Sequence, residues 1–338
     1  MYIFTISVSR ATGLCIICEN KIRLMTKFTI IRSIALIILS IGVYSQLYSQ
    51  SASAIKLFRF GDGSNEKPGV AIAGRHIDVS AFGEDYDENF FASDGIVRLK
   101  KWLEKNQSRC PEVASSVRFA SCISRPSKIV AIGLNYLLHV QESNIPVPKE
   151  PVIFMKATTA MCGPFDKVII PKNSTKTDYE VELAVIIGKK ASNVSVEDAL
   201  GYVAGYSIIN DYSEREWQLE RPAAQWDKGK SADTFAPLGP YLVTPAEVGD
   251  PHNLSIWLTL NGKKVQDANT SDMIFKVEQL ISDVSKYMTL LPGDVIATGT
   301  PSGVGLGKKP PVYLKPGDVV ELGIEKLGTQ KQTLVAAQ

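Results

Sequence analysis

The sequence predicts an α+β fold dominated by a mixed, rolled β-sheet, and two observations lead to this fold class. From Lys128 onward, short runs rich in Val and Ile outnumber helical patterns and do not alternate regularly with them. A doubly wound parallel sheet would require that alternation. In addition, Ser255–Leu260 and Lys263–Gln266 flank Asn261-Gly262, a pattern typical of an antiparallel hairpin. With 338 residues, 45% of them apolar, the chain can bury a large core.

The spacing of apolar residues predicts the other elements. One helix should open at Ser93-Asp94, and another, with a Ser-x-x-Asp cap, should span Ser195–Leu200. A third helix should end before Pro292-Gly293. The apolar faces of the first and third helices comprise Ile96, Leu99, Trp102 and Leu103, and Val277, Leu280, Ile281, Val284, Tyr287 and Met288. The remaining predicted strands are 178–188, Val203–Asn210, Val295–Thr298 and Val319–Ile324.

Composition and pattern divide the chain into a leader segment (1–54), a small N-terminal region (55–124) and a larger domain (125–338). The formal net charge is +2, but residues 1–54 hold five Lys or Arg and one Glu, a net +4, so the rest carries −2. A nearly neutral body argues against nucleic acid as a partner. We therefore expect a small-molecule function for the larger domain.

The leader segment is typical of two kinds of targeting signal. Ser33–Val43 is apolar but too short for a comfortable membrane span. It follows basic residues and precedes Ala52-Ser53-Ala54, which matches a secretory or periplasmic signal, especially if translation begins at Met25. The segment is also poor in acids and contains Ser and Arg, as mitochondrial leaders are. Both compartments stay open, and in either case the mature domain is not expected to be embedded in a membrane.

Cysteine and histidine usage argues against a disulfide framework and against a His-rich zinc or iron site. Cys15-x-x-Cys18 resembles half of a zinc site, but no second pair follows it. The other cysteines should be reduced thiols; they are Cys110, Cys122 and Cys162. The histidines lack metal-ligand spacing; they are His76, His139 and His252.

Glu180 and Glu182 are the first candidates for chemistry. Two apart in a predicted strand, they should face the same side, about 6.6–7 Å apart along the chain. Taken alone, they could be a solvated strand face, but Asp211 ends the apolar strand Val203–Asn210 and can join them. Three buried carboxylates need a positive charge, and they suit Mg²⁺ or Mn²⁺ better than Ca²⁺ for catalysis.

Arg215 and Lys230 are the cations nearest in sequence to these acids, and each could hold an anionic substrate. The alternative is a surface charge paired with a neighbouring acid. By sequence alone, Gln218 is expected to lie on the surface. His139 and Glu142, three apart, can touch on a helical turn, so that Glu142 orients a general base; the alternative is an ordinary surface pair.

The Gly-rich run 298–308 fits neither a Walker loop nor a GxGxxG motif. Next to a strand end it can still bring backbone N–H groups to a carboxylate. The sequence contains no Gly-x-Ser-x-Gly elbow, which disfavours a serine hydrolase.

Together these residues resemble the fumarylacetoacetate hydrolase superfamily over about 125–338. The matching stretches, in the family's order, are IGLNYLLHVQE (132–142), EPVIFMK (150–156), DYEVELAVIIGKK (178–190), NDYSEREWQ (210–218), GKSADTFAPLGP (229–240) and PGDVIATGTPSGVG (292–305). The resemblance implies a mixed β-roll of the family's C-terminal type, a homodimer, Mg²⁺ or Mn²⁺ as cofactor, and a mitochondrial location.

Position by position, the resemblance implies a role for each candidate. The metal ligands would be Glu180, Glu182 and Asp211; the catalytic residues His139, Glu142 and Lys230; and the substrate-binding residues Arg215, Gln218 and Thr300. The chain departs from the family at Tyr212, Glu214, Glu216 and Ala232, and these departures predict a reshaped pocket.

The resemblance implies a divalent-metal-dependent enzyme that acts on small 2-oxo acids through a metal-bound enolate. The family members most similar to this chain resemble oxaloacetate keto–enol tautomerases, which is the first expectation. An acylpyruvate-type C–C hydrolase is the second, and oxaloacetate decarboxylase is a further outcome of the same enolate. A non-catalytic binding protein with the same fold is the remote alternative, because the complete carboxylate set argues against lost activity.

Overall fold

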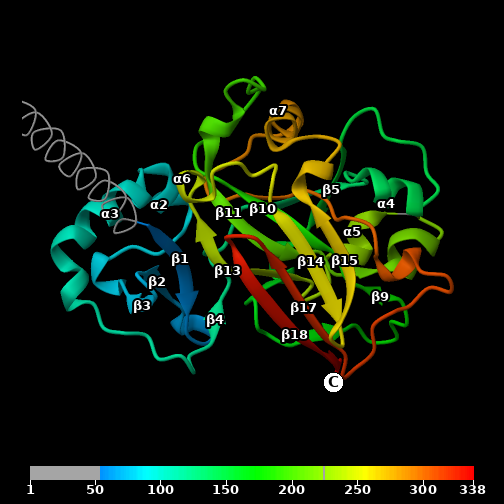
Figure 1. Ribbon diagram of the computed structural model, residues 1–338, viewed down its shortest axis with the longest axis horizontal. Coiled ribbons are helices and arrows are strands. Elements are labelled where there is room, and N and C mark those ends of the chain that lie inside the picture. Colours follow the sequence, from blue (N-terminus) through cyan, green and yellow to red (C-terminus); the bar gives the residue numbers. More distant parts are fainter. Residues whose placement is uncertain (1–53, 224) are drawn as a thin grey trace, which may run out of the picture. The chain divides into compact units, whose positions relative to one another are not determined.

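β-Strands make up most of the regular structure in residues 54–223 and 225–338, which the computed structural model describes (Figure 1). In chain order they are β1 (Ile55–Phe60), β2 (Lys67–Ile72), β3 (Arg75–Asp78), β4 (Phe119–Ala120), β5 (Ile129–Gly133), β6 (Val152–Lys156), β7 (Met161–Cys162), β8 (Val168–Ile170), β9 (Thr177–Asp178), β10 (Val181–Ile187), β11 (Val203–Asn210), β12 (Ser213–Glu214), β13 (Ala236–Val243), β14 (Ser255–Leu260), β15 (Lys263–Asn269), β16 (Val295–Ala297), β17 (Val319–Ile324) and β18 (Gly328–Ala336).

The helices are short and lie between these strands. They are α2 (Glu88–Ala92), α3 (Gly95–Asn106), α4 (Leu137–Glu142), α5 (Trp226–Lys230), α6 (Pro245–Val248) and α7 (Val277–Tyr287). A π-helix spans Glu216–Glu220, and the 3-10 turns include η5 (Ala199–Tyr202) and η8 (Gly305–Gly307).

The strands form two main sheets. The larger one follows the order β3-β2-β1-β13-β11-β10-β16-β5-β6, with β4 beside β1 and β7 beside β13. The smaller one follows the order β15-β14-β17-β18-β8, and β12 pairs separately with β9. Both are mixed: β16 runs parallel to β5 and β18 parallel to β8, whereas β10 is antiparallel to β11 and β16. The predicted α+β class with a mixed sheet is therefore confirmed.

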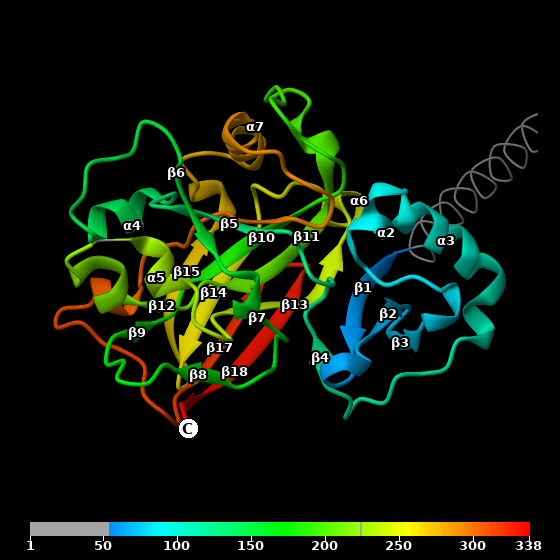
Figure 2. The same ribbon diagram turned by 180° about the vertical axis from the view of Figure 1, so that it is seen from behind.

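The core lies where the two sheets face each other. β14 and β17 lie against β10, while β18 lies against β11 and β13, an arrangement visible from both sides (Figures 1 and 2). Every residue of β10 is buried, although its second residue is Glu182. A continuous apolar run is what a strand covered on both faces requires. An acid within it therefore needs a specific partner.

Residues 55–124 extend the larger sheet rather than building a separate one. β1 pairs antiparallel with β13, through Lys56 with Val243 and Leu57 with Leu242, and α2 and α3 lie beside β1–β3 (Figure 1). The division of residues 55–338 at residue 124 stays a prediction. The predicted leader, apart from Ala54, and the Cys15–Cys18 pair lie outside the described residues.

Several predicted elements are confirmed. α3 begins after Asp94 and buries Leu99 and Leu103, α7 matches the predicted amphipathic helix, and β14 and β15 form the hairpin. Its turn places Asn261 and Gly262 at φ of 50° and 79°, as a primed turn demands. The thiols Cys110, Cys122 and Cys162 are free, as expected.

The helix predicted at Ser195–Leu200 is wrong. Ser195 Oγ does accept a hydrogen bond from the N–H of Asp198 at 3.2 Å, but only the 3-10 turn η5 follows. Val196 and Leu200 are exposed and Ala199 is the one buried residue of the turn η5, so the segment lacks the broad apolar face that an α-helix would bury. A single isolated turn without such packing does not propagate into an α-helix.

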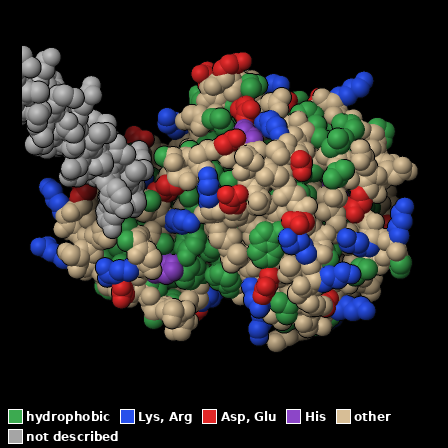
Figure 3. Space-filling model, in the orientation of Figure 1, with side chains coloured by type: hydrophobic (Ala, Val, Ile, Leu, Met, Phe, Trp, Pro, Cys, Tyr) green, Lys and Arg blue, Asp and Glu red, His purple; other side chains and the backbone are tan. Residues whose placement is uncertain are grey.

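The described surface carries charges of both signs. On the face shown in Figure 3, basic and acidic side chains are interspersed rather than separated, in keeping with the nearly neutral body. Among the helices between residues 54 and 338 that the structure describes, none has the length and apolar character that a membrane crossing requires.

Two buried glutamines on β18 join the sheets. Gln330 Nε2 donates to the carbonyl oxygens of Ile208 (2.8 Å) and Gly239 (2.9 Å), and Gln332 Nε2 donates to Pro164 O (2.6 Å). Both side chains are buried. Removing one donor here leaves buried acceptors without a partner, which is costly.

We expect Gln330→Met to lower the free energy of unfolding by about 1–3 kcal/mol, because it deletes that donor at similar volume. Urea unfolding measures the change. The control Thr333→Met alters an exposed position on the same strand and should stay within about 0.5 kcal/mol. Equal effects of the two substitutions would contradict the role given to Gln330.

Candidate active site

Three carboxylates meet where β10 begins and β11 ends. Glu182 lies within β10, Glu180 directly precedes it, and Asp211 follows β11. The N–H of Asp211 donates to the carbonyl of Glu180 at 2.8 Å, which fixes the two segments side by side. One oxygen of each carboxylate lies within 4.8 Å of the others, and all three side chains are buried. The structure thus brings together the three residues that the sequence suggested as metal ligands.

Two lysines bind these carboxylates. Lys230 of α5 donates from Nζ to Glu180 Oε2 at 2.6 Å and to Asp211 Oδ2 at 2.8 Å. Lys156, at the end of β6, donates to the other oxygen of Asp211 at 2.5 Å and also to the carbonyls of Tyr212 and Lys230. Sequence reasoning missed Lys156. Its signal was a lysine at the end of an otherwise apolar strand, where a buried cation needs an acid.

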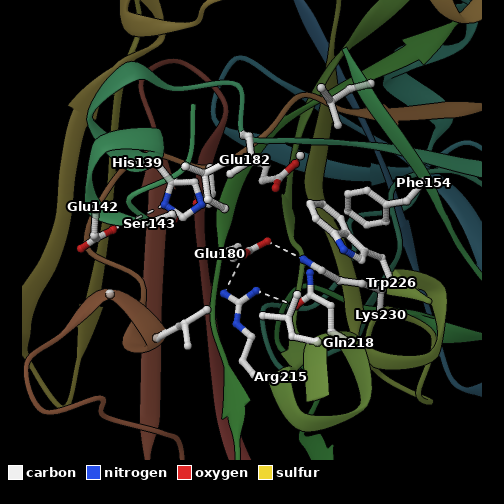
Figure 4. A pocket seen from close by; sticks show the side chains of 18 residues that line it. His139, Glu142, Ser143, Phe154, Glu180, Glu182, Arg215, Gln218, Trp226 and Lys230 are labelled. Atoms are coloured by element: carbon white, nitrogen blue, oxygen red, sulfur yellow. Dashed lines mark hydrogen bonds and ion pairs between the residues drawn. The ribbon is translucent and has the colours of Figure 1, made fainter. Parts of the chain in front are cut away.

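Arg215 holds Glu180 from the other side. Its Nη2 donates to Glu180 Oε1 at 2.7 Å and its Nη1 to Gln218 Oε1 at 3.0 Å (Figure 4). Its Nε donates to Asp178 Oδ2 at 2.9 Å. The bond to Gln218 orients that amide, whose N–H₂ group donates to no other group in the described part of the chain. Gln218 is buried, not on the surface as the sequence alone suggested. Asp178 is a second residue that the sequence did not single out.

Buried negative charge exceeds buried positive charge at this site by one. The acids are Asp178, Glu180, Glu182 and Asp211, and the bases are Lys156, Arg215 and Lys230. Burial alone would raise the pKa of Glu180, but Lys230 and Arg215 lower it well below its usual range. Burial, together with the charges of Asp211 and Glu180, raises the pKa of Glu182 far above its usual range. Glu182 is therefore the acid of this site without a basic partner, and its surroundings favour the neutral form until a cation replaces the proton.

The residues present fit a divalent metal ion. In the described part of the chain, the only protein hydrogen bond to the Glu182 carboxylate comes from the N–H of Gly299 at 2.8 Å. A cation bound by Glu180, Glu182 and Asp211 would supply the positive charge that Glu182 lacks. All three ligand atoms are carboxylate oxygens, the donors that hard cations prefer.

His139 and Glu142 form a pair on α4, at the opposite side of the same pocket. His139 Nδ1 lies 3.4 Å from Glu142 Oε2, and the second ring nitrogen points away from Glu142 toward the pocket (Figure 4). Burial alone would raise the pKa of Glu142, but hydrogen bonds from His139 and from the N–H of Gly303 lower it below the ordinary value. Glu142 is thus ionised at neutral pH and can accept a hydrogen bond from Nδ1, so that Nε2 is the ring nitrogen presented to the pocket.

The Gly-rich run 298–308 donates backbone N–H groups to carboxylates of the chain itself. Gly299 donates to Glu182, Gly303 to both oxygens of Glu142 at 3.0 and 3.2 Å, and Gly305 to Asp178 at 2.7 Å. The predicted approach of backbone N–H groups to a carboxylate is therefore observed. One loop therefore contacts both the acidic cluster (Glu180, Glu182 and Asp211) and the His139–Glu142 pair.

A pocket of about 340 Å³ is lined by the charged and polar side chains Glu180, Glu182, Arg215, Gln218, Lys230, His139 and Glu142. Its other wall is apolar and includes Phe154, Trp226, Ile145 and Leu219; Lys230 Nζ lies 5.1 Å from the centre of the Phe154 ring. Sequence reasoning missed this wall, because an aromatic residue in an apolar run gives no sign of which cavity it will face.

Thr300 lines the pocket, but its hydroxyl already has two partners. It donates to the carbonyl of Val181 at 3.0 Å and accepts from Gln266 Nε2 at 2.8 Å. A direct role in substrate binding must compete with these bonds. The four departures from the family pattern do not line the pocket; they are Tyr212, Glu214, Glu216 and Ala232. Whether these departures reshape the pocket from outside its lining stays a prediction.

Glu142 should make the folded state sensitive to acid. Because its pKa is lowered on folding, its ionised form stabilises the folded state above about pH 4.5, and this contribution is lost as the pH falls below that value. We expect the difference in urea midpoint between the wild type and Glu142→Gln to be largest near neutral pH and to shrink below pH 4.5. A difference that stays constant or grows in acid would contradict this assignment.

Residues 128–335 match the family described as fumarylacetoacetate (FAA) hydrolase C-terminal. A protein of Burkholderia multivorans (strain ATCC 17616 / 249), provisionally named a hydrolase, is 51% identical over 286 residues, 84% of this chain and 100% of the relative. Among solved structures, maleylpyruvate hydrolase from Sphingobium sp. SYK-6, in complex with manganese(II) ion and pyruvate, is 30% identical, with a TM-score of 0.69 and coverage of 84% and 100%. The 2-hydroxyhepta-2,4-diene-1,7-dioate isomerase from Mycobacterium marinum is 31% identical, with a TM-score of 0.63 and coverage of 84% and 99%.

These similarities agree with the resemblance that the sequence motifs indicated. The family match covers most of the strand-rich part of the chain, including every residue of the acidic cluster and both residues of the His139–Glu142 pair. The relatives are covered over nearly their whole length, so the similarity is not confined to a fragment. The chain belongs to the fumarylacetoacetate hydrolase family.

Proposed function

We propose that this chain is a divalent-metal-dependent enzyme that acts on small 2-oxo acids, with keto–enol tautomerisation of oxaloacetate as its reaction. The observation that carries the proposal is that Glu180, Glu182 and the His139–Glu142 pair line one pocket, with the Asp211 carboxylate within 4.8 Å of the two glutamates. Similarity to one hydrolase and one isomerase supports it, because an enolate serves both reactions.

Glu180, Glu182 and Asp211 would hold the metal ion, Mg²⁺ or Mn²⁺. Manganese occurs in the similar maleylpyruvate hydrolase structure, together with pyruvate, a 2-oxo acid. When bound, the ion supplies positive charge beside the 2-oxo oxygen, where negative charge develops as the enolate forms.

His139 would move the proton. In the keto-to-enol direction, His139 Nε2 takes a proton from C3, and the C–H electron pair becomes the C2–C3 double bond. The C2=O π electron pair moves onto the 2-oxo oxygen, which takes a proton from solvent, and the imidazolium of His139 then returns its proton to solvent. Glu142 holds the Nδ1–H throughout, which fixes the tautomer and stabilises the imidazolium that forms.

Gln218 and Lys230 would bind the anionic groups of the substrate. The Gln218 amide is oriented by Arg215 and presents its N–H₂ group to the pocket. Lys230 uses two of its N–H bonds on Glu180 and Asp211, and the third is available to a substrate oxygen. Arg215 mainly positions Glu180, since three of its N–H bonds go to protein acceptors.

The second candidate is hydrolysis of an acylpyruvate at the C3–C4 bond. The observation that favours it is the apolar wall of Phe154, Trp226, Ile145 and Leu219, which offers a surface for an acyl group. The same His139–Glu142 pair would then activate a water molecule. The homodimer and the mitochondrial or secretory location stay predictions, which gel filtration and a fluorescent fusion of residues 1–60 would test.

A chelator-treated protein lacking residues 1–54 should lose activity and regain it with Mg²⁺ or Mn²⁺. Glu182→Gln should weaken Mn²⁺ binding about 10-fold or more, because it removes one oxygen ligand's charge. Electron paramagnetic resonance of free Mn²⁺ measures the affinity. The control Glu321→Gln changes an exposed ion pair with Lys331 and should leave the affinity unchanged; equal losses would contradict the assigned site.

His139→Asn should slow enzyme-dependent decay of enol-oxaloacetate by about 10²–10⁴-fold, the usual contribution of a general base. Ultraviolet absorbance follows this decay beside that of acetylpyruvate. Mn²⁺ binding should persist, and the control His252→Asn, which lies outside the pocket, should retain activity. Cleavage of acetylpyruvate by the wild type would favour the hydrolase, and turnover of neither substrate would reject both reactions.

A further inference from the structure

Gly307 lies against the carboxylate of Glu142. A Cβ atom built on Gly307 would stand 2.2 Å from Glu142 Cδ and 2.5 Å from Oε1 and Cγ. The backbone φ of Gly307 is not in the left-handed region. Any residue could therefore adopt this backbone, and only the close approach of Glu142 requires a glycine here.

The Gly-rich loop 298–308, which contains Gly307, also donates hydrogen bonds to Glu142. The N–H of Gly303 reaches both carboxylate oxygens. Glu142 thus lies between this N–H, the surface of Gly307 and the imidazole of His139. Three contacts from different directions leave the carboxylate little freedom to turn away from His139.

The loop itself is fixed by the acidic site. Asp178 accepts the N–H groups of Gly305 at 2.7 Å and Leu306 at 2.9 Å. The same carboxylate binds Arg215, which holds Glu180. A chain of direct contacts therefore connects Glu180, on one side of the pocket, to Glu142 on the other.

We propose that Gly307 is a positioning residue: by leaving room for the Glu142 carboxylate, it sets the orientation of His139 for proton transfer. This proposal rests on the proposed function only for its activity readout. The position of the imidazole and its hydrogen bond to Glu142 can be measured without any substrate.

Gly307→Ala tests the proposal with little risk to the fold. The three atoms nearest to the added methyl belong to the Glu142 side chain and not to the backbone, so Glu142 must shift from its contacts. We expect metal-dependent turnover to fall about 10–10²-fold, as displacements near 1 Å do, with Mn²⁺ affinity unchanged. The control Gly201→Ala adds a methyl where no atom lies within 4 Å and should behave as wild type.

A double-mutant cycle separates positioning from a general structural role. If Gly307 acts through Glu142, then Glu142→Ala with Gly307→Ala should be no slower than Glu142→Ala alone, because alanine lacks the side-chain atoms that the methyl would displace. Losses that multiply would overturn the proposal, as would full activity of Gly307→Ala.

Nitrogen NMR of the imidazole rings gives the independent readout. The chain has three histidines, His76, His139 and His252, and His139→Asn assigns the relevant signals. In Gly307→Ala, the His139 ring signals should shift while the other two stay. If the wild type turned over neither substrate, the proposed function would fail, yet this shift would still support the positioning role; unshifted signals would overturn it.

Discussion

An excess of buried acidic over buried basic side chains at one site governs this structure. Four carboxylates and three basic side chains are buried at the end of β10, where water cannot screen them. Glu180 and Asp211 are paired with Lys230, Arg215 and Lys156, but Glu182, buried at the pocket, has a single backbone N–H donor in the described chain. Such an arrangement is unfavourable for folding alone and fits the cation proposed for this site.

The fold supplies this arrangement through rigid elements. Glu182 lies in β10, Glu180 directly precedes it and Asp211 directly follows the neighbouring strand β11, so the separation of the three carboxylates is set by the paired strands. The Gly-rich loop adds the connection to His139 and Glu142, because its N–H groups contact acids of both groups. The metal-ligand candidates and the proton-transfer candidates are therefore parts of one contact network.

The parts of the fold and of the candidate site that depend on residues close together in the sequence could be predicted. Alternation in a strand places Glu180 and Glu182 together, a short spacing brings His139 to Glu142, and Asn261-Gly262 predicts the hairpin. Lys156, Asp178 and Trp226 could not be found in this way, because their roles depend on which distant segment packs beside them. The helix expected at Ser195–Leu200 failed for the same reason: a local cap cannot replace a buried face.

The central claim is that the acidic cluster binds one divalent cation. The most direct measurement is calorimetric titration of the metal-free protein, lacking residues 1–54, with Mn²⁺ at neutral pH. The account predicts one ion bound per chain, with release of protons to the buffer if Glu182 is protonated before binding. Absence of binding, or binding that persists when the charges of Glu180, Glu182 and Asp211 are removed together, would contradict it.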